Sequence, residues 1–246
     1  DILIVTGKNK KILEDYFDRA PDLERLLEQD KNEDLLRLCR STEGMANIHY
    51  VRQSHATGFA DAIMLAKTFT GDDPFAILLG DDIIYTPNGV RPGIGQLVDC
   101  FEETGNPTVA VMEVADADIP KYANIKGESI GKNRYAIEKI VEKPAVKDKF
   151  SNRAVIGRYV VDSDIYDVIR STPPSRSGEV YFTDALGLLA KQNRLVGCVF
   201  EGKRYDAGNK QEYLEANIEY ALRSKELGDS MRSYILNLSK TLEEKK

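Results

Sequence analysis

The sequence predicts an α/β protein with a doubly wound, mostly parallel sheet, an antiparallel ribbon and C-terminal helices. Strand-length apolar stretches alternate with segments of helical periodicity over residues 1–115, which is typical of a parallel sheet whose strands are joined by helices. Residues 75–79 form a continuous apolar run, as expected for a strand buried on both faces near the middle of a sheet. From residue 122 to 144, glycines and weak alternation replace the helical repeats, which favours an antiparallel ribbon.

The predicted strands are short apolar segments that end at polar or glycine-containing turns. We expect them at residues 2–5, 48–51, 75–79, 108–114, 154–161 and 195–200. Residues 83–85 look like further extended chain after the third of these strands. Because helical segments separate most of the early strands, the predicted sheet is Rossmann-like.

The predicted helices carry apolar residues three and four positions apart. We expect them at residues 9–17, from Asp22 after a break at Pro21, around 35–38, and at 60–69, 96–103, 163–169, 183–190, 212–223 and 231–238. The last two are amphipathic, and such terminal helices more often make packing or dimer contacts than chemistry. This pattern favours a homo-oligomer, a dimer or a tetramer.

Composition and charge exclude several classes of protein. The chain has 246 residues, of which 42% are hydrophobic and 30% charged, so it can bury a sizeable core. A net charge of −6 argues against a nucleic-acid or membrane-surface partner. Three widely spaced cysteines give neither a disulfide framework nor a zinc motif, and no apolar run is long enough to span a bilayer. A cytoplasmic protein is therefore expected.

Two adjacent carboxylates follow the apolar run at residues 75–79. Asp81 and Asp82 come just after its end, and ligands of open α/β sheets bind outside the carboxyl ends of the strands. A helix N-cap or a turn would also explain them, but the extended residues that follow weaken that interpretation. Adjacent carboxylates repel unless a cation or hydrogen-bond donors offset them, and Mg²⁺ prefers oxygen ligands. The pattern indicates a metal and a phosphate.

Two other places allow a binding interpretation beside a structural one. The polar loop 53–58 lies between a strand and a helix, where backbone amides can hold a base or phosphate, although a plain connection is the commoner explanation. Gly157 interrupts a predicted strand, and this indicates either a bulge or the close approach of another backbone or a ligand.

A series of motifs, in order along the chain, resembles one family. The motifs are DILIVTGKNK, VRQ with GFADAI, FAILLGDDII, KIVEKP, AVIGRY, GEVYFTDAL and FEGKRYDAGNKQEYLEAN. Together they are similar to the bacterial UTP-glucose-1-phosphate uridylyltransferases, within the sugar-nucleotidyltransferase superfamily. The similarity runs from Asp1 to about Asn217.

The resemblance implies a nucleotide site and a metal site. Gln53 matches the glutamine that reads the uracil edge, which suits an amide because it offers a donor and an acceptor. Gly58 would bring its backbone close to the base. Asp81 and Asp206, 125 positions apart in sequence, match the aspartates that bind Mg²⁺, and Asp81 also contributes to nucleotide binding.

The resemblance also implies a sugar-phosphate site. Glu142 would accept hydrogen bonds from glucose hydroxyls, and Lys143 would pair with the sugar phosphate as a point charge. Gly157 would present its backbone to the sugar. Asp82 is left either as a residue that supports the metal ligands or as a residue of the fold. Asp81, Lys143 and Asp206 are the expected catalytic residues.

The implied reaction forms UDP-glucose and pyrophosphate from UTP and glucose-1-phosphate. An oxygen of glucose-1-phosphate attacks the α-phosphorus of UTP in line, and catalysis comes from positioning and charge neutralisation. On this basis we expect residues 1–115 to form a nucleotide-binding half, residues 116–210 a sugar-phosphate-binding half, and residues 211–246 the C-terminal helices with a possible dimer contact.

Two departures from the family pattern qualify the resemblance. The family's glycine-rich triphosphate loop and its opening strand do not occur in the sequence, so we expect a preceding segment on the order of 50 residues. Ala123 stands where the family usually has a glycine after a tyrosine, and alanine disfavours a positive φ.

Two other functions remain open. A glycosyltransferase could use an aspartate-rich metal motif with a sugar nucleotide, and it would release UDP instead of pyrophosphate. A binding protein without the triphosphate loop could hold a nucleotide or a sugar phosphate without turning it over.

Overall fold

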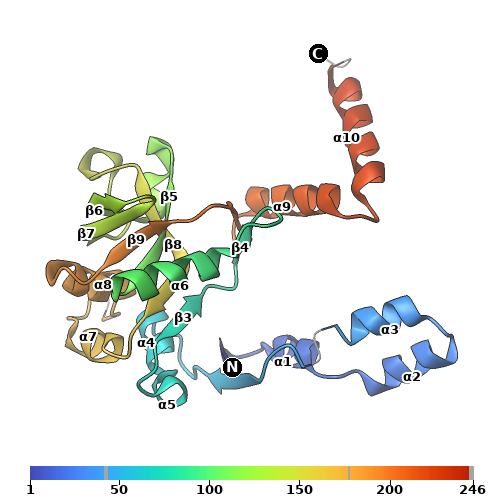
Figure 1. The fold of residues 1–246 in the computed structure, drawn as a ribbon, viewed down its shortest axis with the longest axis horizontal. Helices are drawn as coiled ribbons and strands as arrows, with labels where there is room; N and C mark the ends of the chain where they lie inside the picture. Colours follow the sequence, from blue (N-terminus) through green and yellow to red (C-terminus); the bar gives the residue numbers. More distant parts are fainter. Residues whose placement is uncertain (42–43, 177, 244–246) are drawn as a thin grey trace. The chain divides into compact units, whose positions relative to one another are not determined.

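The computed structural model describes residues 1–41, 44–176 and 178–243 (Figure 1). The chain forms two compact units, one of Asp1–Asp73 and Ser163–Ala185 and the other of Pro74–Asp162 and Leu186–Lys246, and each is described by itself. These units divide the chain at other points than the boundaries predicted at residues 115 and 210. The assignment of nucleotide and sugar phosphate to those predicted halves stays a prediction.

The first unit contains a parallel pair of strands with three short helices between them along the chain. The strands are β1 (Ile2–Thr6) and β2 (Ile48–Arg52), and the helices are α1 (Lys11–Phe17), α2 (Pro21–Gln29) and α3 (Glu33–Cys39). Pro21 occupies the first position of α2, where an amide hydrogen would have no helical partner. Asn32 caps α3 because its side chain accepts a hydrogen bond from the Leu35 amide at 3.2 Å.

Four further helices lie in this unit or begin in it. They are α4 (Phe59–Met64), α5 (Lys67–Thr70) and α7 (Ile165–Ser171), and α8 (Phe182–Lys191) starts here. The single helix predicted at 60–69 is thus interrupted between α4 and α5. The hydroxyls of Thr70 and Tyr166 lie 2.6 Å apart, and the rings of Phe59 and Phe182 meet edge to face with centroids 5.3 Å apart. These contacts join segments that are far apart in sequence.

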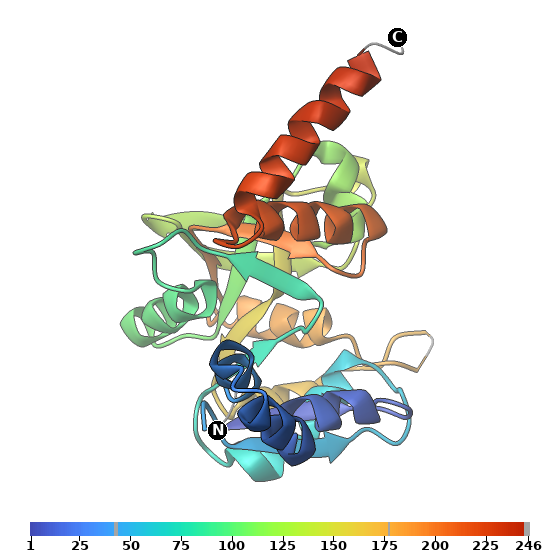
Figure 2. The ribbon, with the colours of Figure 1, turned by 90° about the vertical axis from the view of Figure 1, so that its right-hand side faces the viewer.

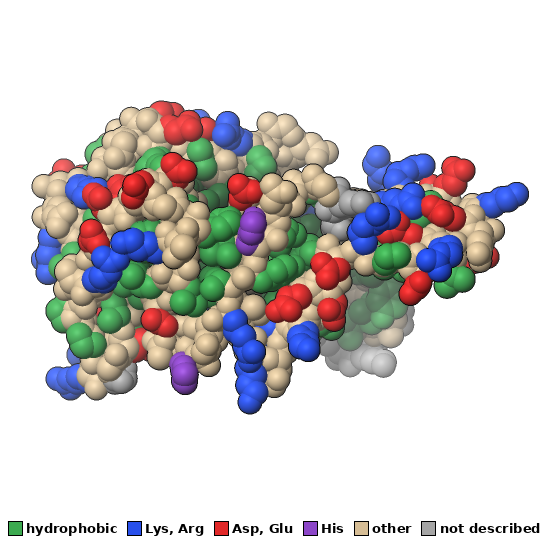
Figure 3. All heavy atoms as spheres, turned by 90° about the horizontal axis from the view of Figure 1, so that it is seen from below, with side chains coloured by type: hydrophobic (Ala, Val, Ile, Leu, Met, Phe, Trp, Pro, Cys, Tyr) green, Lys and Arg blue, Asp and Glu red, His purple; other side chains and the backbone are tan. Residues whose placement is uncertain are grey.

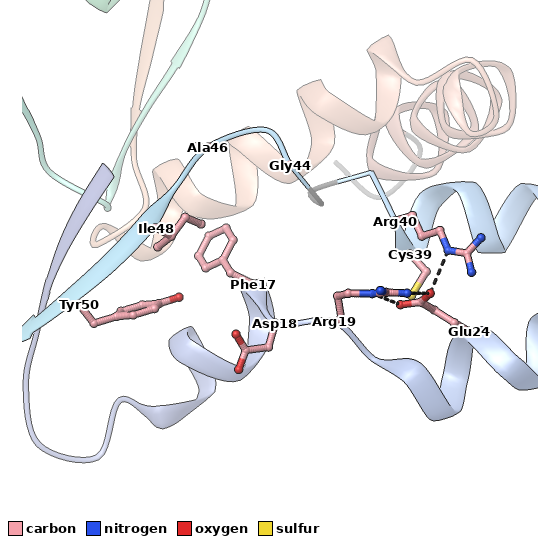
Figure 4. Close-up of a pocket in the computed structure, with 10 residues that line it drawn as sticks. All are labelled: Phe17, Asp18, Arg19, Glu24, Cys39, Arg40, Gly44, Ala46, Ile48 and Tyr50. Carbon is pink, nitrogen blue, oxygen red and sulfur yellow. Dashed lines mark hydrogen bonds and ion pairs between the residues drawn. The ribbon is translucent and has the colours of Figure 1, made fainter. Parts of the chain in front are cut away.

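A buried carboxylate ties α2 to α3. Glu24 is 4% exposed and lies between the guanidinium groups of Arg19 and Arg40 (Figure 4). Arg19 Nη2 donates to it at 2.7 Å and Arg40 Nε at 2.9 Å. Hydrogen bonds from Arg19 and then Arg40 lower the pKa of Glu24 from 4.5 to about 2. These ion pairs therefore hold α2 and α3 together, which the exposed leucines of the two helices cannot do.

The second unit is built on a six-stranded sheet in the order β3-β8-β5-β9-β7-β6. Its strands are β3 (Phe75–Leu78), β5 (Thr108–Glu113), β6 (Ala123–Gly131), β7 (Arg134–Val141), β8 (Arg153–Val161) and β9 (Val196–Val199). β6 and β7 form the predicted antiparallel ribbon. A separate antiparallel pair consists of β4 (Asp82–Tyr85) and β10 (Lys203–Asp206).

Helix α6 (Gly93–Thr104) closes the core of this sheet. It begins after Pro92 and ends at Gly105, whose φ of +63° is the left-handed conformation that glycine adopts without strain. Its apolar side packs on the sheet in one buried cluster, which includes Leu97, Cys100, Ile156, Val160, Cys198 and Phe200. Two short 3₁₀ turns, Asp116–Lys121 and Val146–Asp148, connect the strands around the ribbon.

The chain ends in the helices α9 (Lys210–Arg223) and α10 (Gly228–Glu243). The Tyr205 hydroxyl donates to Glu219 of α9 at 2.6 Å, which anchors this helix on β10. Helix α10 extends away from the sheet (Figures 1 and 2), and Tyr234, Leu238 and Leu242 are exposed along it. The predicted oligomer contact at these helices stays a prediction.

The α/β class, the antiparallel ribbon and the C-terminal helices are confirmed, but two details differ from expectation. Fewer strands than expected are parallel. Among the described residues, only β1 with β2 and β5 with β9 pair in parallel. The main departure is β8, which runs antiparallel to both β3 and β5. The prediction that β3 is buried on both faces was wrong. β3 lies at the edge of the six-stranded sheet, and Leu78 is 52% exposed.

The surface carries both signs of charge. Acidic and basic side chains are interspersed on the face shown in Figure 3, in keeping with the modest net charge of −6. Within residues 1–41, 44–176 and 178–243, no helix is both long enough and apolar enough to cross a membrane.

We expect Glu24→Gln to loosen the α2–α3 pair. The folded-state pKa of Glu24 lies below its usual 4.5, so its contribution is complete above that pH and is lost as the pH falls towards about 2. Backbone hydrogen exchange in α2 and α3 should therefore be faster in the variant at pH 7, and the difference should shrink on acidification. The exposed Glu33→Gln is the control, and equal exchange in Glu24→Gln and this control would contradict the prediction.

Candidate active site

The pairing of β4 with β10 brings together the two aspartates predicted to bind metal. Asp206 stands opposite Asp82 in this antiparallel pair, and the Ala207 amide donates to the Asp81 carbonyl at 2.8 Å. A Cβ placed on Gly208 would lie 3.0 Å from Asp206 Oδ1 and 3.5 Å from Asp81 Oδ2. Both carboxylates therefore reach the same small volume beside Gly208, although 125 positions separate them in sequence.

This pair of carboxylates fits a magnesium ion. Mg²⁺ is commonly bound by one or two carboxylates, with water and substrate phosphate completing its octahedron. In the part of the chain that the structure describes, no group of three or more His, Cys, Asp or Glu side chains could hold a metal. A closed, all-protein metal site is thus not formed here, whereas Asp81 and Asp206 offer two hard oxygen donors.

Asp82 serves the fold next to this pair. Its side chain is buried, and its Oδ2 accepts the Gly157 amide at 2.6 Å while its Oδ1 accepts Arg204 Nε at 2.6 Å. One carboxylate thereby joins the start of β4, the middle of β8 and β10. Of the two possibilities left open for Asp82, these contacts give it a role in the fold, and through Arg204 it also reaches the expected ligand Asp206.

Two arginines contact Asp82, the buried Arg158 and the partly buried Arg204, and the sequence did not identify either. Arg204 also donates to the Tyr122 hydroxyl at 2.9 Å and lies 3.3 Å from Asp206 Oδ2. Arg158 donates to the carbonyls of Leu79 and Gly157, each at 2.8 Å, and to the carbonyl of Asp82. The only sequence feature that pointed to them is their position, because Arg158 follows Gly157 and Arg204 lies two residues before Asp206.

The two guanidinium groups differ in their electrostatic surroundings. Burial lowers the pKa of Arg158. Burial also acts to lower the pKa of Arg204, but the charge of Asp82, followed by Tyr122 and Asp206, outweighs it and raises that pKa above its usual value. Arg204 is therefore a permanent cation next to the aspartate pair.

Gly157 is a glycine because two side chains approach it closely. A Cβ at this position would lie 2.5 Å from Asp82 Oδ2 and 2.7 Å from Leu79 Cβ. The pairing of β5 with β8 also changes register opposite this residue, between Val109 and Val111. Both structural interpretations of Gly157, the bulge and the close approach, thus apply. Its predicted contact with the sugar stays a prediction.

Glu142 and Lys143 follow β7 and connect to the same network. The Lys143 amide donates to the Tyr122 carbonyl at 3.1 Å, and its Nζ lies 3.8 Å from Glu142 Oε1. Lys143 has a φ of +43°, a region that side-chain-bearing residues seldom occupy and that is often found at functional sites. Tyr122 thus links the Lys143 backbone to the Arg204 guanidinium.

Ala123 is an ordinary strand residue in spite of its departure from the family pattern. It begins β6, pairs with Val155 of β8 and is buried. Ala123 is not among the described non-glycine residues that have a positive φ. Alanine is therefore compatible with the backbone at this position.

The two predicted nucleotide-binding residues are neighbours in the first unit. Gln53 follows β2, and its Nε2 donates to the Gly58 carbonyl at 3.1 Å. Gly58 precedes α4 with a φ of +116°, and a Cβ there would collide with the Glu179 side chain. Both the backbone conformation and the close approach of Glu179 require a glycine.

A cavity of about 230 Å³ also lies in the first unit, beside α1, α2 and α3 (Figure 4). Phe17, Glu24, Arg40 and Tyr50 are among its lining residues. None of the predicted site residues lines it. The two arginines in its lining, Arg19 and Arg40, are already paired with the Glu24 carboxylate. We therefore do not assign the substrate site to this cavity.

Comparison with known proteins places the chain among the nucleotidyl transferases. The model of the family described as nucleotidyl transferase matches residues 1–223. A UTP–glucose-1-phosphate uridylyltransferase of Streptococcus pyogenes serotype M3 is 40% identical, over 100% of this chain and 83% of its own length. This relative confirms the resemblance inferred from the motifs. It is named as a uridylyltransferase and not as a glycosyltransferase.

Solved structures agree with this comparison. A UDP-glucose pyrophosphorylase complexed with UDP-glucose is 35% identical with a TM-score of 0.80, covering 90% of this chain and 81% of its own. A UTP-bound enzyme of the same kind from Acinetobacter baumannii is 30% identical with a TM-score of 0.86, covering 96% and 82%. With a family model that covers nearly the whole chain and relatives of this similarity, the chain belongs to the nucleotidyl transferase family.

Proposed function

We propose that this chain forms UDP-glucose and pyrophosphate from UTP and glucose-1-phosphate. The observation that carries the proposal is the meeting of Asp81 and Asp206 beside Gly208, because a nucleotidyl transfer needs a place for a metal-bound phosphate. The similarity to a uridylyltransferase over 83% of that relative's length supports the choice of reaction. Similar structures complexed with UDP-glucose and with UTP support the choice of substrates.

In this proposal Asp81 and Asp206 hold Mg²⁺. When bound, the ion would neutralise phosphate charge and orient the α-phosphate for attack. Arg204 fixes the position of Asp206, since its guanidinium lies 3.3 Å from Asp206 Oδ2 and is itself held by Asp82. The backbone bond from Ala207 to Asp81 keeps the two ligands in register.

The sugar phosphate is assigned to Lys143 and Glu142 in the same unit. The Lys143 side chain is 61% exposed, so its ammonium can reach an incoming phosphate without a large cost of desolvation. Glu142 can accept hydrogen bonds from sugar hydroxyls. Gly157 would contribute a backbone contact near the same sugar.

The uracil is assigned to Gln53 and Gly58 in the first unit. The base would meet the Gln53 amide, and Gly58 would bring its backbone close to the ring. An oxygen of glucose-1-phosphate then attacks the α-phosphorus in line with the departing pyrophosphate. Lys143 would hold the attacking phosphate, so the chain contributes mainly orientation and charge.

The direct test is pyrophosphate release by the purified protein. We expect release only when UTP, glucose-1-phosphate and Mg²⁺ are all present, with UDP-glucose formed in equal amount. Release of UDP from UDP-glucose in the presence of an acceptor, without pyrophosphate, would indicate a glycosyltransferase instead. Nucleotide binding without turnover would contradict the catalytic proposal.

We expect Asp206→Asn to weaken the metal site without unfolding the protein, because asparagine keeps the shape but loses the charge. Turnover at a fixed Mg²⁺ concentration should fall by about 100-fold, the upper end of losses seen for changes around metal ligands. The Mg²⁺ concentration at half-maximal rate should rise. The exposed Asp229→Asn serves as the matched control, and a half-maximal Mg²⁺ concentration and a turnover of Asp206→Asn equal to those of this control would reject the assignment.

We expect Lys143→Gln to act on glucose-1-phosphate more than on UTP. Loss of a charged donor to a phosphate should raise the KM for glucose-1-phosphate by about tenfold or more. Lys139→Gln is the matched control, since Lys139 is an exposed lysine four residues earlier, in β7. An equal rise in both KM values would show that Lys143 does not belong to the sugar-phosphate site.

A further inference from the structure

The Gln53 side chain is fixed by two hydrogen-bond acceptors. Its Nε2 lies 3.1 Å from the carbonyl oxygen of Gly58 and 3.2 Å from Asp61 Oδ2. A carbonyl and a carboxylate oxygen can only accept, so the amide atom that faces both must be the NH₂ group. The chemistry of the two partners therefore determines the orientation of the amide.

Asp61 is itself held in place as an acceptor. It lies in the first turn of α4, and the Thr57 hydroxyl donates to the same oxygen, Oδ2. The hydrogen bond from Thr57, followed by that from Gln53, lowers the pKa of Asp61. At neutral pH this side chain is thus a carboxylate that cannot turn a donor towards Gln53.

This arrangement changes what Gln53 can offer to a base. Both N–H groups of its amide face protein acceptors, and the carbonyl oxygen Oε1 is the group left for a ligand. An acceptor recognises the N3–H of uracil, whereas N3 of cytosine is itself an acceptor and would be repelled. Gln53 would thus recognise the base through its acceptor oxygen alone. The sequence had led us to expect that it would use both a donor and an acceptor.

We infer that Asp61 is a positioning residue that sets base selectivity by fixing the Gln53 amide. The inference rests on the proposed function, in which Gln53 meets the uracil. Without Asp61 the amide could rotate by 180° and present its NH₂ group to N3 of cytosine. Asp61 therefore acts against cytidine nucleotides without needing to touch the base.

The test measures the dissociation constants of UTP and CTP by calorimetry, so that it does not depend on turnover. Asp61→Ala removes the acceptor, and alanine is well tolerated in a helix. The ratio of CTP to UTP dissociation constants should fall by about threefold to tenfold, the effect of one exposed hydrogen bond. Asp61→Asn keeps an oxygen acceptor and should retain most of the selectivity. The control is Asp72→Ala, at an exposed aspartate of the same unit.

A double variant separates positioning from a general structural effect. If Asp61 acts through Gln53, then adding Asp61→Ala to Gln53→Ala should leave the ratio unchanged, whereas Gln53→Ala alone lowers it. The inference is overturned if Asp61→Ala leaves the ratio at the parent value while Gln53→Ala lowers it. It is also overturned if Asp61→Ala lowers the ratio equally with and without Gln53.

The outcomes distinguish this inference from the proposed function. If Gln53→Ala does not alter the ratio, the assignment of the uracil to Gln53 fails, and the role of Asp61 fails with it. If the parent protein binds neither UTP nor CTP, the proposed function is itself rejected. Thermal unfolding of each variant shows whether a change in ratio accompanies loss of the fold.

Discussion

The buried carboxylate of Asp82 is the interaction on which the second unit depends. It accepts hydrogen bonds from the backbone of Gly157 and from the guanidinium of Arg204, so it joins three strands that are remote in sequence. Removal of one partner from a buried ion pair typically costs about 3–5 kcal/mol, because the other charge stays desolvated. The arrangement requires a glycine at position 157, since any side chain would occupy the space of this carboxylate.

The same network supplies the electrostatic balance of the candidate metal site. Asp81 and Asp206 are two negative charges that face one small volume, and Arg204 is a cation held against Asp206. One guanidinium can stabilise this pair without neutralising it, which leaves an attraction for a divalent ion. Fold and chemistry thus share Arg204, because it contacts both the structural Asp82 and the expected ligand Asp206.

The first unit shows a second use of a carboxylate to orient a polar group. Asp61 and the Gly58 carbonyl together take the NH₂ group of Gln53, so an amide that can face either way has one favoured orientation. Glu24 plays a similar part for whole helices, because it holds α2 and α3 together by accepting hydrogen bonds from Arg19 and Arg40. In each case an anion acts through another residue. Such effects are hard to infer from residue types alone, since the partners lie on different segments.

The sequence by itself determined the local elements and the residue types of the site. Apolar periodicity gave the strands and most helices, and the motifs around Asp81, Lys143 and Asp206 indicated the chemistry. Only the tertiary structure decided that β8 runs antiparallel between β3 and β5, that β3 is an edge strand, and that Arg204 joins the aspartates. The physical reason is that periodicity reports which face of a segment is apolar, whereas strand order and buried ion pairs depend on contacts between distant segments.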